Sequence, residues 1–163
     1  TTNSKNEPSV RMVLLKGLSK KGFVFYTNLK SPKSNDLKNN PNAAMCFHWK
    51  SLQRQIIISG SITQVNDKEA DAYFNSRPYE SRIGAWASEQ SKAMNKREEL
   101  LEKIDELKKK YKDPNNVPRP KHWSGWCLNP SLFEFWLGDK YRIHERLKYN
   151  KVSNNWKKEI LYP

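Results

Sequence analysis

Short apolar runs, rich in β-branched and aromatic residues, recur along most of this chain, and turn-forming residues separate them. Runs of this length and composition predict β-strands. We expect strands over Val10–Lys16, Phe23–Asn28, Ala43–Trp49, Arg54–Val65, Trp123–Asn129, Leu132–Gly138, Arg142–Tyr149 and Trp156–Leu161. Several short strands divided by turns are typical of an antiparallel barrel or sandwich. The spacing therefore predicts a mainly β chain.

Three further segments predict helices beside these strands, which places the chain in the α+β class. They occupy Ser31–Asn40, Asn66–Ser76 and Asn95–Lys112. Pro32 suits the first helical position after a cap at Ser31. In the longest segment, apolar residues recur at helical spacing between charged ones, and Asn95 and Glu98 have the spacing of a capping box.

The length of 163 residues favours a single domain over residues 1–163, which can bury a core without a disulfide or a structural metal. Cys46 and Cys127 lie in apolar runs outside any CxxC pair, so we interpret them as small core residues in a reducing, cytoplasmic compartment. No apolar stretch approaches the roughly 20 residues of a membrane span. Asn3–Pro8 reads as a turn between two strands with almost nothing before it, so we expect the natural protein to begin upstream.

The balance of charge is strongly basic, with 30 Lys and Arg against 17 Asp and Glu and a net charge of +13. Such a balance attracts polyanions or small phosphorylated ligands, and a solvated basic surface is the alternative. Aromatic residues beside basic ones, as in Phe47–Lys50, leave a nucleic-acid-binding barrel open. Many cations, however, lie in stretches such as Lys108–Lys112 and Lys157–Lys158, which are typical of a solubilising surface, so we expect no nucleic-acid partner.

Common catalytic signatures are absent from the sequence. It contains no GxGxxG, Walker loop, GxSxG or HExxH, and no His/Cys cluster has zinc spacing. These absences argue against a dinucleotide fold, a P-loop enzyme, a serine hydrolase and a metal site.

A basic run near the end of the chain favours an anion site. On a strand, alternate residues share a face, so Arg142, His144 and Arg146 are expected to line one side. Cations on one face repel one another unless an anion or an acidic partner lies opposite. The alternative is a solvated basic strand, or pairing with an acid such as Glu134.

A second set of residues suits phosphate. Tyr73 and Arg77 are four apart and therefore share one helix face, and Ser81 is expected in the loop that follows. Hydroxyl, guanidinium and hydroxyl groups form a plausible phosphate clamp, whereas in the alternative Tyr73 is a core residue and Arg77 forms a surface ion pair. Lys33 lies in the first turn of the Ser31–Asn40 helix, where free N–H groups attract phosphate.

Taken together, these segments resemble the pyridoxine (pyridoxamine) 5′-phosphate oxidase family from Arg11 to Pro163. The shared pieces occur in the order of the family: Arg11–Lys16, Phe25–Asn28, Arg54–Gln55, Tyr73–Pro78, Ile83–Trp86, Gln90–Ser91, Pro118–Pro120, Trp123–Gly125, Glu134–Trp136 and Arg142–Arg146. One departure is Ser31-Pro32-Lys33, where the family has Ser-Arg-Lys, so Pro32 replaces an arginine that binds the flavin phosphate.

The resemblance implies an antiparallel, Greek-key-like FMN-binding split β-barrel, and a homodimer with its active sites at the subunit interface. It implies oxidation of pyridoxamine or pyridoxine 5′-phosphate to pyridoxal 5′-phosphate, with O2 as acceptor and H2O2 as product. An FMN split-barrel oxidoreductase with another substrate is the alternative.

The resemblance also implies roles for individual residues. FMN would be bound by Arg11, Met12, Val13, Leu14, Leu15, Lys16, Tyr26, Thr27, Lys33, Gln55, Gln90, Ser91, Trp136 and Arg146. The substrate phosphate would be held by Lys16, Tyr73, Arg77 and Ser81. Arg142 and His144 would be the catalytic residues and would lie over the pyridine ring.

Overall fold

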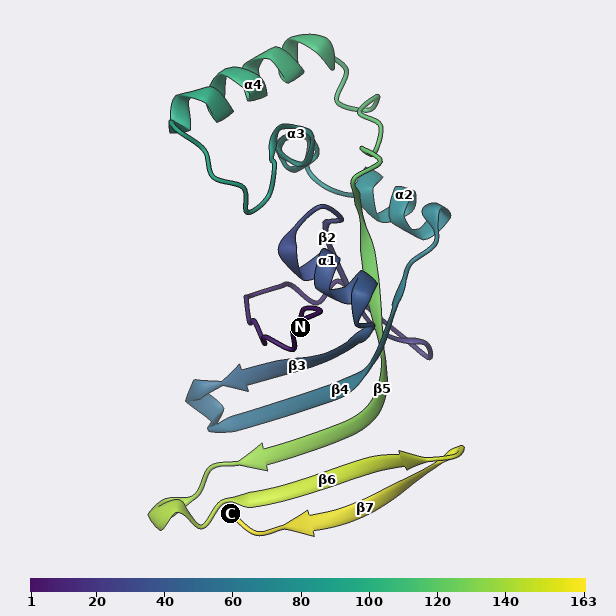
Figure 1. Ribbon diagram of the computed structural model, residues 1–163, viewed down its shortest axis with the longest axis vertical. Coiled ribbons are helices and arrows are strands. Elements are labelled where there is room, and N and C mark those ends of the chain that lie inside the picture. Colours follow the sequence, from purple (N-terminus) through teal and green to yellow (C-terminus); the bar gives the residue numbers. More distant parts are fainter.

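The computed structural model describes residues 1–163 as one antiparallel sheet with helices at one end (Figure 1). The strands are β1 (Gly17–Ser19), β2 (Gly22–Asn28), β3 (Asn42–Trp49), β4 (Arg54–Gln64), β5 (Trp123–Leu137), β6 (Glu145–Val152) and β7 (Asn155–Leu161). The helices are α1 (Pro32–Asn39), α2 (Asp67–Asn75), α3 (Tyr79–Ala87) and α4 (Arg97–Lys110), with 3-10 turns η1 (Lys50–Leu52) and η2 (Lys140–Arg142). The prediction of a mainly β chain with flanking helices is confirmed.

Strand β5 is the centre of the sheet because it pairs with three other strands. Its first half pairs with β2 and its second half with β6, while β4 pairs along most of its other edge. The order is β1-β2-β5-β4-β3, with β6 and β7 continuing from β5, and β1 and β3 do not pair with each other, so the sheet is open. Figure 1 shows β5 running from the helices at one end of the molecule down to β6.

The two strands predicted over Trp123–Asn129 and Leu132–Gly138 are therefore one strand. An irregularity in the pairing with β4, between Ser59 and Gly60, accommodates the residues around Pro130 without ending β5. A side chain at Gly60 would not fit there, since its Cβ would lie 1.9 Å from the Asn129 carbonyl oxygen. The turn-forming residues thus produce a bulge and not a turn.

The strand predicted over Val10–Lys16 is wrong. The Lys16 N–H donates to the Val24 carbonyl at 2.8 Å, but residues 10–16 otherwise run outside the sheet. The side chains of Val10 and Met12 are 97% and 95% exposed. A β-branched run forms a strand only where a neighbour can pair with it, and this chain supplies none there.

Three of the four helices were predicted, and α3 was not. The Asn66 side chain caps α2 by accepting from the Glu69 N–H at 2.8 Å, whereas α4 is preceded by Lys96, so the capping box at Asn95 is wrong. Pro78 occupies the N-cap position of α3, which begins where a loop was expected. Ser81 consequently lies on α3 and not in a loop.

The core is divided between the sheet and the helices. One apolar cluster, Phe25, Leu37, Ile58, Ile62, Trp126 and Leu128, joins α1 to β2, β4 and β5. Another, Phe74, Ile83, Val117 and Trp123, joins α2 and α3 to the start of β5. The expected turn over Asn3–Pro8 is present and is closed by a single bridge between Thr2 and Pro8. None of the helices combines the length and the apolar character that crossing a membrane would require.

Because β5 carries the packing of both clusters, Leu128→Ala should destabilise the fold. Leu128 is fully buried, and removing such a side chain costs about 2–5 kcal/mol of unfolding free energy. Urea unfolding at fixed protein concentration measures the change. Leu18→Ala is the matched control, because Leu18 is 68% exposed and should lose less than about 1 kcal/mol. Equal losses in the two variants would contradict this account of the core.

Candidate functional site

A cavity of about 610 Å³ lies where α1, α2, α3 and the start of β5 meet. We call it the cationic cavity, because the buried Lys33 and the half-buried Arg77 both line it. Residues expected to bind FMN or substrate that line it are Met12, Val13, Leu14, Lys16, Tyr26, Thr27, Lys33, Tyr73, Arg77, Ser81 and Gln90. The structure thus brings together residues that are spread over the first 90 positions of the chain.

Lys33 is the first of these cations. It follows Pro32 in the first turn of α1, and a tight turn fixes that helix: the Ser31 and Ser34 hydroxyls both donate to the Asn28 carbonyl, at 2.7 and 3.0 Å. The side chain of Trp126 donates to the Ser34 hydroxyl at 3.1 Å, which ties α1 to β5.

The ammonium group of Lys33 has only neutral partners. Its Nζ donates to Thr27 Oγ1 at 2.9 Å, to Ser31 Oγ at 3.2 Å and to Gln90 Oε1 at 2.9 Å, and the residue is only 7% exposed. Burial lowers the pKa of the Lys33 ammonium, and the charge of Arg11 lowers it further. A buried cation without a carboxylate is costly unless an anion neutralises it.

Arg77 is the second cation. It follows the end of α2, so the prediction that it shares a helix face with Tyr73 is wrong, although both residues line the cavity. Its guanidinium lies over the rings of Trp123 and Phe74, with the central carbon 4.7 and 5.6 Å from their centroids. Its Nη1 is buried without a hydrogen-bond partner, and burial lowers the pKa of the group. No carboxylate pairs with Arg77, so the alternative of a surface ion pair does not describe it.

Three aromatic rings form the wall behind Arg77. The ring of Tyr26 is stacked between its neighbours, 4.0 Å from that of Tyr73 and 5.2 Å from that of Trp123. Burial, with the charge of Glu69 as a smaller cause, raises the pKa of Tyr26 to about 12, so its hydroxyl stays protonated at neutral pH. Ser81 reaches the same cavity from the first turn of α3. Trp123 was the residue that sequence reasoning missed; its place in the Trp-Ser-Gly motif was the only signal.

A second cavity, of about 960 Å³, lies at the other end of the sheet between the ends of β4, β5, β6 and β7. Four of the expected site residues line it: Gln55, Trp136, His144 and Arg146. Trp136 and His144 lie with ring centroids 4.8 Å apart, and the Asp139 N–H donates to His144 Nδ1 at 3.1 Å. We call this the C-terminal cavity; it shares no lining residue with the cationic cavity.

The expectation that Arg142, His144 and Arg146 alternate on one strand is wrong. Arg142 ends η2 with a φ of 64°, directly after Tyr141 at 56°, and β6 begins only at Glu145. Two successive left-handed residues reverse the chain direction, so alternation cannot extend back to Arg142. Arg142 is exposed and lines neither of the two cavities.

Arg146 has the acidic partner that the alternative interpretation named. Its Nε and Nη2 donate to Glu134 Oε1 on the neighbouring strand, at 3.0 and 2.7 Å. Its Nη1 donates to the Tyr162 carbonyl at 3.2 Å. These contacts hold the guanidinium at the wall of the C-terminal cavity.

The remaining expected residues lie near the cationic cavity without lining it. Arg11 and Leu15 line an adjoining cavity of about 600 Å³, which Lys33 also reaches. Arg11 donates to Thr1 Oγ1 at 2.7 Å and to the Ser9 hydroxyl. Ser91 follows Gln90 in an exposed turn with a φ of 68°.

Comparison with known proteins identifies two matching family models. One, described as pyridoxamine 5′-phosphate oxidase, matches residues 1–111, and the other, described as pyridoxine 5′-phosphate oxidase C-terminal dimerisation region, matches residues 123–163. The pyridoxine/pyridoxamine 5′-phosphate oxidase of Pelagibacter ubique is 61% identical, over 100% of this chain and 79% of the relative. The one from Cytophaga hutchinsonii is 49% identical, over 92% and 70%.

Solved structures agree with this fold. PhzG from Burkholderia lata 383, in complex with tetrahydrophenazine-1-carboxylic acid, has a TM-score of 0.93 at 29% identity and covers 100% of this chain and 79% of its own. An FMN-binding protein related to pyridoxamine 5′-phosphate oxidase, from Nostoc punctiforme, has a TM-score of 0.79 at 15% identity, with coverage of 100% and 85%, and supports the fold alone.

The electrostatics of Lys33 predict a variant that is stable and yet impaired in anion binding. Because its folded-state pKa lies below its unfolded value, charged Lys33 lowers stability at pH 7, and this cost disappears only as the pH rises through both values. Lys33→Met should therefore melt at or above the wild-type temperature without ligand. Inorganic phosphate should raise the melting temperature of the wild type far more than that of the variant.

Differential scanning fluorimetry at pH 7, with and without phosphate, measures both effects. Lys38→Met is the matched control, since Lys38 is exposed on the same helix and should leave the phosphate response unchanged. A Lys33→Met protein that melts several degrees lower and keeps the full phosphate response would contradict the assignment.

Proposed function

The chain belongs to the pyridoxamine 5′-phosphate oxidase family, and from this premise we propose that it oxidises pyridoxamine or pyridoxine 5′-phosphate to pyridoxal 5′-phosphate. It is an oxidoreductase that uses FMN, with O2 as acceptor and H2O2 as product, and it serves vitamin B6 biosynthesis and salvage. Cys127 is buried as expected, whereas Cys46 is exposed, so its interpretation as a core residue is wrong. Two free thiols fit a reducing compartment, which we take to be the cytoplasm.

The observation that carries the proposal is a pair of cations, the buried Lys33 and the half-buried Arg77, in one cavity without a carboxylate. FMN and the substrate each bring a phosphate, and Lys33 would bind one while Arg77, with Lys16, would bind the other. The buried Nη1 of Arg77, which has no partner, and the neutral contacts of Lys33 both fit this use. When bound, FMN would accept a hydride from the substrate carbon and pass the electrons to O2.

FMN would be held by the residues that the family resemblance assigns to it. Lys33, with Thr27 and Gln90 already at hydrogen-bond distance, would bind its phosphate. Pro32 has no N–H to donate at the start of α1, so more of the binding depends on Lys33.

Substrate orientation would depend on the clamp of Lys16, Tyr73, Arg77 and Ser81, all of which line the cationic cavity. Fixing a remote phosphate places the reacting carbon, so binding energy is used for orientation. Charged guanidinium donors bind phosphate strongly, and the cation–π contact with Trp123 holds Arg77 in place.

At the other end of the substrate, Arg142 would steer the pyridine ring and stabilise developing charge. His144 Nδ1 accepts a hydrogen bond from the Asp139 N–H, so the neutral ring carries its proton at Nε2. The Nε2–H group is therefore the hydrogen-bond donor that His144 would present to the substrate.

A complete site requires two subunits. Trp123 and Trp136 lie near opposite ends of β5, roughly 40 Å apart along the strand at about 3.3 Å per residue, and each belongs to a different cavity. Apolar side chains are exposed around the C-terminal cavity, as expected of an interface: Trp49, Leu52, Leu137, Ile143 and Ile160. We place the C-terminal cavity of one subunit against the cationic cavity of its partner, with the two sheets forming the split barrels of a homodimer.

The likeness to PhzG favours one alternative, a flavin oxidoreductase of the same fold that acts on another substrate. The compound bound in that structure, tetrahydrophenazine-1-carboxylic acid, carries a carboxylate and no phosphate. A clamp of four phosphate-binding side chains argues for a phosphorylated substrate. Turnover of pyridoxamine 5′-phosphate, compared with that of pyridoxamine, distinguishes the two functions.

Arg77→Ala should raise the KM for pyridoxamine 5′-phosphate by about ten- to a hundredfold, because charge-assisted hydrogen bonds contribute ~1.5–3 kcal/mol. Arg142→Leu should mainly lower kcat. Steady-state kinetics and the visible absorption of bound flavin measure these changes, and the dephosphorylated substrate is the control, since its KM should not depend on Arg77. A wild-type protein that takes up no FMN, or equal flavin loss in both variants, would contradict these roles.

The two-subunit site predicts complementation between these two impaired variants, assayed at a substrate concentration well below the KM of Arg77→Ala. In a mixed dimer of Arg77→Ala and Arg142→Leu subunits, both changes fall in one site and the other site is intact. A one-to-one mixture, unfolded and refolded together, should therefore recover about one quarter of the wild-type activity through its mixed dimers. Each variant refolded alone is the control. No recovery, or a monomer in sedimentation at assay concentration, would disprove the shared site.

A further inference from the structure

We propose that Arg119 is a positioning residue for the substrate phosphate: it fixes α2, and through it Tyr73 and Arg77, against Trp123. This inference rests on the function proposed above. Arg119 lies in the segment between α4 and β5, outside both cavities, and would not contact the substrate.

Arg119 holds the first half of α2 by two ion pairs. Its Nε donates to Asp71 Oδ1 at 2.5 Å and its Nη2 to Asp67 Oδ1 at 2.7 Å. The two acids are four residues apart and therefore share one face of the helix. A guanidinium fork can engage both at once, which an ammonium cannot do with the same geometry.

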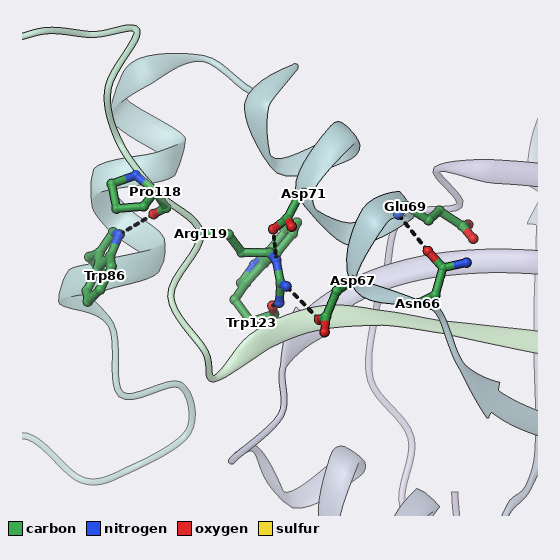
Figure 2. A network of polar contacts seen from close by, with 8 residues as sticks. All are labelled: Asn66, Asp67, Glu69, Asp71, Trp86, Pro118, Arg119 and Trp123. Carbon is green, nitrogen blue, oxygen red and sulfur yellow. Dashed lines mark hydrogen bonds and ion pairs between the residues drawn. The ribbon is translucent and has the colours of Figure 1, made fainter.

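The same guanidinium also holds the start of β5. Its Nη1 donates to the Trp123 carbonyl at 2.8 Å, and Figure 2 shows Arg119 between the two aspartates and Trp123. The indole of that tryptophan lies under Arg77, with Phe74 edge-on to it at 5.1 Å. The backbone of Trp123 is thus fixed to the beginning of α2, and its ring supports the residue that follows the end of α2.

The neighbour of Arg119 fixes the other helix of the clamp. Trp86 on α3 donates from its Nε1 to the Pro118 carbonyl at 2.7 Å, as Figure 2 shows. The helix α3 carries Ser81, and α2 leads to Arg77. Two consecutive residues of one segment therefore set the spacing between the two sides of the clamp.

Stabilisation of the fold alone does not account for this arrangement. Asp67 and Asp71 have side chains that are 84% and 53% exposed, and ion pairs with exposed partners contribute little to stability. The docking of α2 is already supplied by Ala70 and Phe74, both fully buried. Arg119 instead fixes the orientation of α2, since its three contacts allow this helix only one position relative to Trp123.

The test compares Arg119→Met, Arg119→Lys and the matched control Lys121→Met in the FMN-loaded protein. Lys121 is exposed in the same segment and makes no ion pair. Arg119→Met should raise the KM for pyridoxamine 5′-phosphate about tenfold, since small displacements of a binding group are costly. Its kcat, its flavin content and its KM for pyridoxamine should stay at wild-type values.

Two further measurements separate positioning from a general loss of structure. Calorimetric titration with pyridoxal 5′-phosphate should show the same weakening of binding in Arg119→Met without any turnover, and partial recovery in Arg119→Lys. In an Arg77→Ala background, Arg119→Met should have almost no further effect on the KM, because the two changes act on one clamp.

The outcomes are distinct from those that test the function itself. A wild-type protein that does not oxidise pyridoxamine 5′-phosphate contradicts the proposed function. An active wild type with an Arg119→Met variant that binds the phosphate normally overturns the positioning role. Equal rises in KM for both substrates, or an additive effect with Arg77→Ala, overturn it as well.

Discussion

The structure depends on the continuous pairing of β5 with three strands. A 15-residue strand is long for a protein of this size, and only its length allows β2 and β6 to share one edge while β4 covers the other. Its first residue, Trp123, lies among the helices, and Trp136 lies at the C-terminal cavity. One strand thus carries both halves of the proposed site and, because it is extended, keeps them apart within a subunit.

The electrostatic design of the cationic cavity follows from burial. Lys33 and Arg77 are held by neutral groups, aromatic faces and backbone, so their charges have no compensation from the protein. In the absence of an anion, these uncompensated charges lower the free energy of unfolding, but they allow the cavity to bind an anion tightly. The proposed ligands, each bearing a phosphate, would reverse that loss on binding. By contrast, Arg119 and Arg146 form ion pairs with carboxylates, which fits structural roles in which they fix neighbouring elements and do not bind a ligand phosphate through an unpaired charge.

Sequence reasoning succeeded where the relevant contacts are local. The helix over Asn66–Ser76 could be predicted from neighbouring residues, because its start is capped within a single turn by the Asn66 side chain. It failed at Arg142, where two left-handed residues interrupt the predicted strand, and at Pro78, which begins a helix that was not expected. In both places the backbone conformation is selected by packing that the local sequence does not encode.

The sequence by itself determined the mainly β character, three of the helices, the family and the residue types suited to phosphate, because periodicity, caps and ordered motifs are local or cumulative signals. Only the tertiary structure decided that two predicted strands are one, that Lys33 and Arg77 share a cavity without an acid, and that Arg119 joins α2 to Trp123. These facts depend on contacts between residues far apart in the chain. Such contacts are fixed by pairing register and close packing, and no window of sequence contains both partners.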